Sequence, residues 1–304
     1  MPDASAPGMA LQPPIPRPDS GGIAFLALML GNVALALGPW LVRLADVGPI
    51  AAGFWRLALA APLLLLLLAF PSPRRMVPRL PGLLWATLAI GGFFFAADLA
   101  AWHSGILRTR LANATLFGNT SSFLFVIYGF AQARRLPGRM QAFALLLAFV
   151  GAALLLGRSY ELSPRNLVGD LFCLLAGLFY LVYLISVDRA RATLGSLQTL
   201  AFATLFGVAP LLLFALALGE PILPHDWTPL LLLALGSQVL GQGCMVYAIG
   251  LLSPLVVGLT LLTQPIVSAA IGWYVYGEKL GAGDLIGAAA IAVALVLVRR
   301  PARE

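Results

Sequence analysis

The segment that decides the fold is GILRTRLANATL, residues 105–116, in which a short turn leads into the start of an apolar helix. Shifting the sequence by about 143 positions places AIGLLSPLVVGL, residues 248–259, over it. The same shift pairs PGRMQAFALLLAFVGAALLL, residues 137–156, with LGAGDLIGAAAIAVALVLV, residues 280–298. Identity is low, but turns, small residues and helix starts recur in the same order. We therefore expect an internal repeat, the alternative being that two apolar segments align through composition alone.

The composition places this repeat in a membrane. The chain has 304 residues, of which 61% are hydrophobic and only 10% charged, against roughly 25% charged in an ordinary soluble domain. A bilayer core about 30 Å thick needs about 20 apolar residues for each helical crossing. We predict an all-α polytopic membrane protein with ten transmembrane helices, at about 22–42, 49–70, 82–104, 110–131, 139–157, 167–187, 196–218, 229–250, 254–275 and 280–298.

Each repeat holds five of these helices, and an odd number of crossings forces the second copy to enter the membrane upside down. We assign residues 22–158 to the first repeat and 163–298 to the second, with a disordered tail at 1–21 and a short tail at 299–304. Loops on the N-terminal side hold about twice as many basic residues as the opposite loops, so both tails are expected in the cytoplasm. Inverted repeats around a midplane site are the usual architecture of secondary transporters.

The chain also resembles a known family, the drug/metabolite transporter superfamily with two EamA-type repeats. The resemblance rests on three segments: GFWRLALAAPLLLL (53–66), ADLAAWHSGILRTRLANATLFGNTSSF (97–123) and LLSPLVVGLTLLTQPIVSAAIGWYVYGEKL (251–280). It implies a ten-helix exporter with its substrate pocket between the halves, similar to the amino-acid exporters of the YddG type. One feature departs from the pattern, because Glu278 of YGEKLG has no counterpart in the first-repeat segment YGFAQARRLPG.

Two charged residues lie inside predicted membrane helices. Arg56 in the second helix and Asp98 in the third fall at nearly the same depth, because the two helices run in opposite directions. An isolated charge at that depth costs about 2.5–3.5 kcal/mol. We therefore predict that Arg56 and Asp98 pair inside the bundle, where they either seal the outer half of the pathway or hold the two helices in register. A packing role and a role in substrate or proton binding both stay open.

Two neighbours of Asp98 have alternative interpretations. Trp102 shares a helix face with Asp98 and could form a pocket wall or a lipid anchor at the membrane interface. His103 lies about 140° further round the helix, so it does not share that face. A histidine bonded to backbone or water is favoured there over a proton relay.

Other polar side chains recur in the predicted helices. The candidates for the pocket are Asn113 and Asn119 in the fourth helix, Gln238, Gln242 and Tyr247 in the eighth, and Gln264 in the ninth. A single buried amide is usually explained by hydrogen bonds between helices. Their grouping on helices that the repeat relates favours a shared cavity. Tyr180 and Tyr183 in the sixth helix could supply aromatic walls, with core packing as the alternative.

Several function classes lack their sequence signatures. No G-x-x-x-x-G-K-[ST], H-E-x-x-H or G-x-S-x-G motif occurs, so we expect no enzyme activity, no cofactor and no metal. An intramembrane enzyme and a channel stay as rivals. The net charge of +7 is explained by membrane topology, so no nucleic-acid partner is expected. We expect a secondary transporter in a bacterial-type cytoplasmic membrane that exports small polar metabolites, amino acids being favoured over nucleosides, sugars or drugs, with a monomer as the working oligomeric state.

Overall fold

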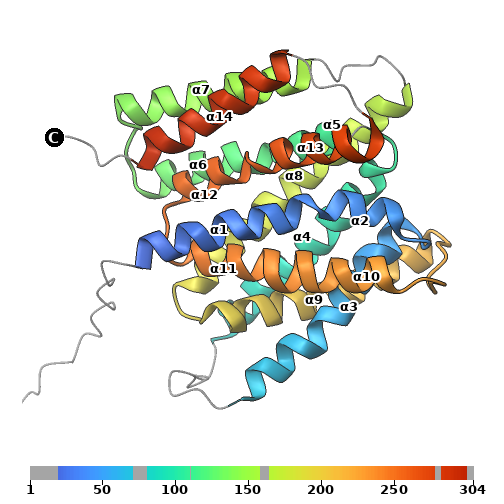
Figure 1. Ribbon diagram of the computed structural model, residues 1–304. Helices are drawn as coiled ribbons and strands as arrows, with labels where there is room; N and C mark the ends of the chain where they lie inside the picture. Colours follow the sequence, from blue (N-terminus) through green and yellow to red (C-terminus); the bar gives the residue numbers. More distant parts are fainter. Residues whose placement is uncertain (1–19, 71–80, 110, 158–163, 278–281, 300–304) are drawn as a thin grey trace, which may run out of the picture.

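The computed structural model describes residues 20–70, 81–109, 111–157, 164–277 and 282–299, and all regular secondary structure in these ranges is helical (Figure 1). The first half comprises α1 (Ser20–Ala36), α2 (Gly38–Leu44), α3 (Pro49–Ala69), α4 (Gly82–Ile106), α5 (Leu111–Gly118), α6 (Thr120–Gln132) and α7 (Arg139–Gly157). The second comprises α8 (Pro164–Arg191), α9 (Ser196–Ala217), α10 (Thr228–Leu232), the π-helix η1 (Leu233–Gln242), α11 (Gly243–Ile249), α12 (Pro254–Leu261), α13 (Gln264–Tyr276) and α14 (Ala282–Arg299). Glu278 and the greater part of both predicted tails lie outside the described residues.

The ten predicted crossings are confirmed, and several of them are built from more than one helix. In the described ranges, seven segments are long and apolar enough to span a membrane: α1 with α2, α3, α4, α8, α9, α10 to α11, and α12 with α13. Three further apolar segments, α5 with α6, α7 and α14, complete the set. Five crossings in each half give the two copies opposite senses, as the repeat predicts.

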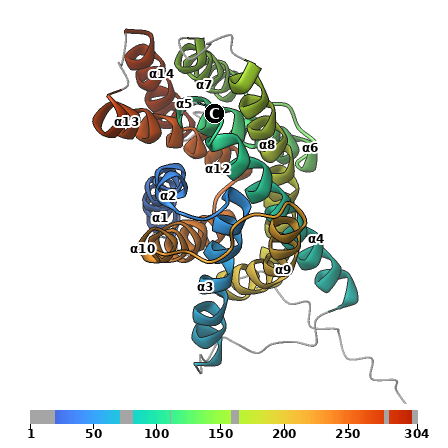
Figure 2. The ribbon, with the colours of Figure 1, turned by 90° about the vertical axis from the view of Figure 1, so that its right-hand side faces the viewer.

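Helix packing follows the internal symmetry. The first crossing packs against η1 and α11 of the eighth, and α4 of the third packs against α8 of the sixth, which is the same contact with the halves exchanged. In both views α7 and α14 lie side by side at one edge of the bundle, and α3 and α9 lie at the opposite edge (Figures 1 and 2). Helices of the first half therefore pack directly against helices of the second half. A site shared by the two halves can form between them.

Glycine allows the halves to approach closely where the fourth and ninth crossings meet. A Cβ atom at Gly258 of α12 would lie 2.5 Å from the carbonyl oxygen of Ser122 in α6. Any larger residue would push the two crossings apart, since real Cβ atoms do not approach backbone so closely. Small residues are common at such interfaces because lipid tails supply no hydrophobic drive for helices to associate.

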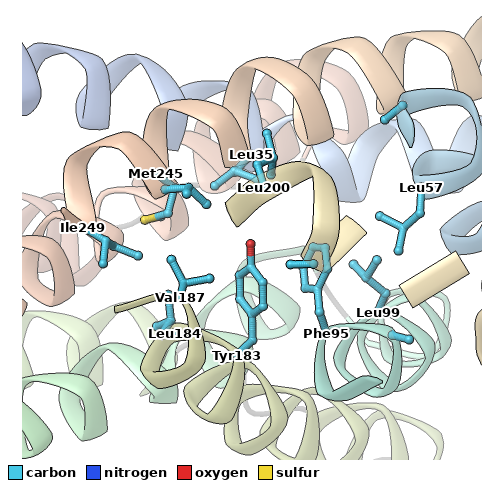
Figure 3. Packing of buried hydrophobic residues seen from close by; sticks show 14 of the residues in the cluster. Leu35, Leu57, Phe95, Leu99, Tyr183, Leu184, Val187, Leu200, Met245 and Ile249 are labelled. Carbon is cyan, nitrogen blue, oxygen red and sulfur yellow. The ribbon is translucent and has the colours of Figure 1, made fainter. Parts of the chain in front are cut away.

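A large cluster of buried side chains fills the centre of the bundle. Figure 3 shows Tyr183 and Phe95 side by side, with Met245 and Leu200 from the second half around them. The rings of Phe95 and Tyr183 stack with centroids 4.4 Å apart. This packing joins α4 and α8 to α9 and α11, so it holds the two halves together beside the candidate site.

Hydrogen bonds from backbone N–H groups to side-chain carboxylates join the two halves at the helix ends opposite the chain termini. The carboxylate of Glu220, which follows α9, accepts the backbone N–H groups of Ile50 and Ala51 at the start of α3. Asp46 accepts the N–H groups of His225 and Asp226. An acidic group is stabilised at a helix start because the first N–H groups there have no partner within the helix.

Candidate functional site

A small cavity, with about 40 Å³ of space in this conformation, lies between the two halves. Asn119, Tyr180 and Gln264 lie on its wall and are close to the midpoints of their crossings. The cavity is lined by Leu35, Arg56, Phe95, Asp98, Leu99, Trp102, Thr115, Gly118, Asn119, Tyr180, Gln242 and Gln264. The wall combines apolar side chains with a few polar groups, as is usual for small-molecule sites.

Two broken crossings meet at this cavity, at positions that the repeat relates. The ninth crossing breaks between α12 and α13 because Pro265 has no N–H to bond the carbonyl of Leu261, four residues earlier. The fourth breaks between α5 and α6 at Asn119, whose side-chain amide donates to the carbonyl of Thr115 at 2.8 Å. Each break brings the start of a half-helix, α6 or α13, to the cavity. Discontinuous helices of this kind mark substrate sites in other secondary transporters.

The eighth crossing reaches the site through the π-helix η1. Gln238 and Gln242 both lie in η1, and both are buried. Gln238 accepts from the Nε of Arg56 at 3.1 Å and donates to Thr204 at 2.9 Å. Gln242 lies on the cavity wall and bonds with the hydroxyl of Tyr180. π-Helical turns are rare and are found frequently at functional sites.

Arg56 and Asp98 face the same cavity, but the predicted direct pair between them is not formed in this conformation. In the described residues, no nitrogen of Arg56 lies within the 4.0 Å of a carboxylate oxygen of Asp98 that defines a salt bridge. Arg56 instead bonds Gln238 and lies over the ring of Phe95, 5.6 Å from its centroid. Arg56 is 1% exposed and Asp98 7% exposed. The sequence could not reveal this difference, since Gln238 is distant along the chain and competes for the guanidinium.

The two neighbours of Asp98 on α4 have different surroundings. Trp102 lies on the cavity wall, where its Nε1 donates to the carbonyl of Ala114 at 3.1 Å. His103 does not line the cavity. Its Nδ1 lies 2.9 Å from the carbonyl of Pro49, and since a carbonyl only accepts, Nδ1 is the protonated nitrogen. This backbone bond is the alternative that the sequence favours over a proton relay.

The structure separates the remaining candidates. Tyr183 lies behind Phe95 in the packed cluster, and its buried hydroxyl has no partner within the described residues. Tyr247 is half-buried near Arg191, away from the cavity wall. Asn113 lies in α5, and its side chain is outside the described residues. The wall thus brings together Arg56, Asp98, Trp102, Asn119, Tyr180, Gln242 and Gln264 from the predicted set, with Gln238 directly behind Arg56.

Sequence reasoning missed Asn32, which supports the wall from α1. Its amide accepts from Gln264 at 2.9 Å and donates to the carbonyl of Thr260 at 2.9 Å. Thr260 lies just before the break in the ninth crossing, and its carbonyl also accepts from the N–H and the hydroxyl of Thr263, so Asn32 ties α1 to the turn at the break. The available signal was a fully buried amide in an otherwise apolar helix.

The fold and the cavity together are those of a membrane transporter with two inverted repeats. The model of the EamA-like transporter family matches residues 22–157 and again residues 167–300, and the chain therefore belongs to that family. A solved structure described only as the crystal structure of a protein is similar, with 20% sequence identity, a TM-score of 0.68, and coverage of 92% of this chain and 97% of that chain. This similarity supports the fold alone. No curated protein matches the chain.

Proposed function

We propose that the chain is a secondary transporter that exports small polar metabolites by alternating access, with amino acids as the favoured substrates. The observation that carries the proposal is the cavity, where Arg56 and Asp98 face the same space without neutralising each other by direct contact. Membership of a transporter family supports transport as the function class.

The opposite charges on one cavity wall favour a zwitterion. An uncompensated charge in a membrane helix costs about 2.5–3.5 kcal/mol, and this cost is relieved when a partner of opposite sign arrives. A molecule that carries both an ammonium and a carboxylate supplies a partner to Asp98 and to Arg56 together. Phosphorylated solutes would call for more basic groups than Arg56, which is the one basic side chain on the described wall.

The half-helices support an orientation of this substrate. A separate helix start carries a partial positive charge of roughly +0.5, and both α6 and α13 begin at the cavity. Only part of that charge remains here, because the N–H groups of Ser122 and Ile266 bond the carbonyls of Asn119 and Thr263 in the breaks. With Arg56, these two ends favour the carboxylate, whereas Asp98 favours the ammonium. The amides of Asn119, Gln242 and Gln264 can hydrogen-bond either group.

The setting of the transporter is part of the proposal. The arginine bias of the loops supports a bacterial-type cytoplasmic membrane with both chain ends in the cytoplasm. We take the bilayer and a small-molecule substrate as the partners, with a monomer as the working state and no nucleic acid.

Counterflow in liposomes tests the proposal. Purified protein is placed in vesicles loaded with one unlabelled solute, and entry of the labelled solute is followed for neutral amino acids, nucleosides and sugars. We expect saturable counterflow for amino acids. Saturable counterflow of nucleosides or sugars alone would assign another substrate class, an ohmic current would indicate a channel, and chemical conversion of the solute would indicate an enzyme.

A pair of matched variants localises the effect to the cavity. Asp98→Asn removes the acid from the wall and should lower counterflow by at least ~10-fold, since an ammonium loses a charged partner. Asp226→Asn removes an acid from the α9–α10 connection and should leave counterflow unchanged. Equal activity of both variants in folded protein would show that Asp98 does not bind substrate.

A further inference from the structure

A second site lies away from the central cavity, on the membrane face of the first half. It begins with an apolar groove whose wall is formed mainly by residues of α6 and α7. The groove has about 1990 Å³ of empty space. Its wall includes Phe123, Ile127 and Phe149, and the last two are 62% and 59% exposed.

The groove has the length of an acyl chain. Its wall runs along the crossing from Phe117 in α5 to Arg134 just after α6, which is roughly 25 Å at 1.5 Å per residue. One leaflet of a bilayer contributes about 15 Å of hydrocarbon. An extended chain from one leaflet can therefore lie in the groove with its polar end near the connection between α6 and α7.

A polar hollow adjoins the groove at that connection. It has about 660 Å³ of empty space and shares Val126, Phe130 and Arg135 with the groove. Its wall adds Gln132 and Gln141 from the two ends of the α6–α7 connection and Ser253 from the start of the ninth crossing. An apolar groove that opens into a hollow with amides, a hydroxyl and a guanidinium matches an amphiphile with a hydrogen-bonding head.

The charge of this end favours an anion. Arg134 and Arg135 both line the groove, Arg135 also lines the hollow, and no acidic side chain is among the described residues that line either. The backbone of both arginines belongs to the turn that ends α6, in which Arg134 has a φ of 50° and the N–H of Arg135 bonds the carbonyl of Phe130. A non-glycine residue in this left-handed conformation is uncommon, so the turn is specified by more than local preference.

We propose that the groove and hollow form a binding site for one anionic phospholipid of the leaflet that faces the α6–α7 connection. The acyl chain lies between α6 and α7, the phosphate contacts Arg134 and Arg135, and the hydroxyl groups of a glycerol head contact the amides of the hollow. The site is separate from the central cavity, and the proposal does not depend on the transported substrate.

Quenching by brominated lipids tests the site. Phe149→Trp places a fluorophore in the groove, and its fluorescence is measured in phosphatidylcholine vesicles with increasing dibrominated phosphatidylglycerol or dibrominated phosphatidylcholine. The parent chain, which has six tryptophans, is measured in parallel to subtract its own quenching. We expect brominated phosphatidylglycerol to quench the added tryptophan at a lower mole fraction than brominated phosphatidylcholine does. Inorganic phosphate should not displace it, because the acyl chain is part of the ligand.

Variants that each remove one arginine charge test whether Arg134 and Arg135 contact the lipid phosphate. Each basic residue near anionic lipid contributes about 1 kcal/mol, so Arg135→Gln and Arg134→Gln should each reduce the preference for phosphatidylglycerol roughly 5-fold. Arg108→Gln removes one charge at the other end of the helices and is the matched control. Arg134→Gly also relieves the strain of a positive φ at this position, because glycine adopts it freely. If this variant is more stable yet loses the preference for phosphatidylglycerol, the loss comes from the missing charge and not from misfolding. Equal quenching by both lipids, or equal effects of Arg108→Gln and Arg135→Gln, would overturn the proposal.

Discussion

Trp102 and Trp85 lie on the same helix, α4, and differ in what they contact. Trp102 lines the cavity and bonds Ala114, whereas Trp85 is 39% exposed and packs edge-on against Phe202. Trp102→Phe removes a donor and enlarges the cavity. We expect the ratio of the alanine counterflow rate to the leucine counterflow rate to fall by about 10-fold in this variant, since added room in a pocket favours the larger side chain. Trp85→Phe should not change that ratio. An equal change in both variants would show that Trp102 does not line the substrate site.

Asp46 makes a pH-dependent tie outside the membrane-spanning helices. The backbone N–H groups of His225 and Asp226 lower the pKa of its carboxyl below the ordinary value of 3.8, the bond to His225 being the larger cause. Because the pKa is lowered on folding, the carboxylate stabilises the folded chain above the unfolded pKa, and this contribution is lost as the pH falls through the folded pKa.

Thermal unfolding of Asp46→Asn checks this sign. At pH 6 the variant should unfold at a lower temperature than the natural chain, and the difference should shrink as the pH is lowered below about 4. If the difference in unfolding temperature stays constant from pH 6 to pH 3, the charge of Asp46 does not hold the α2–α3 connection to the α9–α10 connection.

At the scale of elements, the broken ninth crossing carries the next prediction. Pro265→Ala restores an N–H that can bond the carbonyl of Leu261, so α12 and α13 can become one helix. Pro265 stands in the first turn of α13, where proline is tolerated, so alanine there should leave the stability of the folded chain nearly unchanged. Counterflow should nevertheless fall by at least ~10-fold, because the start of α13 no longer faces the substrate.

Pro62 of α3 is the matched control for this prediction. Pro62 lies inside α3, which continues through it, and its side chain is exposed and is not part of the cavity wall. Pro62→Ala should keep full counterflow. If Pro265→Ala transports normally while its thermal unfolding shows an intact fold, the break is a packing feature and the half-helix has no part in binding.

The same scale shows why the site was only partly predictable. Hydropathy and turn residues locate each crossing, so the depth of Arg56, Asp98 and Gln264 followed from the sequence. The π-helix η1 could not be predicted, since its extra residue per turn depends on packing against neighbours. The bond between Asn32 and Gln264 joins α1 to the ninth crossing, and nothing local in either helix specifies that pairing.

At the scale of the whole molecule, the repeat explains both the topology and the place of the cavity. The first and eighth crossings pack as the third and sixth do, with the halves exchanged. Our proposal of alternating access rests on this symmetry, because two related halves can exchange their arrangements. The direct pairing of Arg56 with Asp98, which the sequence predicts, is absent from this conformation among the described residues.

Access of a single cysteine on the cavity wall tests the central claim most directly. Thr115→Cys replaces the hydroxyl and methyl groups of a wall residue with one thiol, and Cys173→Ala with Cys244→Ala removes the two native thiols. A membrane-impermeant thiol reagent is then applied to oriented vesicles from one side or the other, with and without amino acid. We predict that the thiol reacts from either side, and that a transported amino acid slows both reactions. Reaction from one side alone under every condition, or no protection by any transported solute, would contradict a carrier that alternates around this cavity.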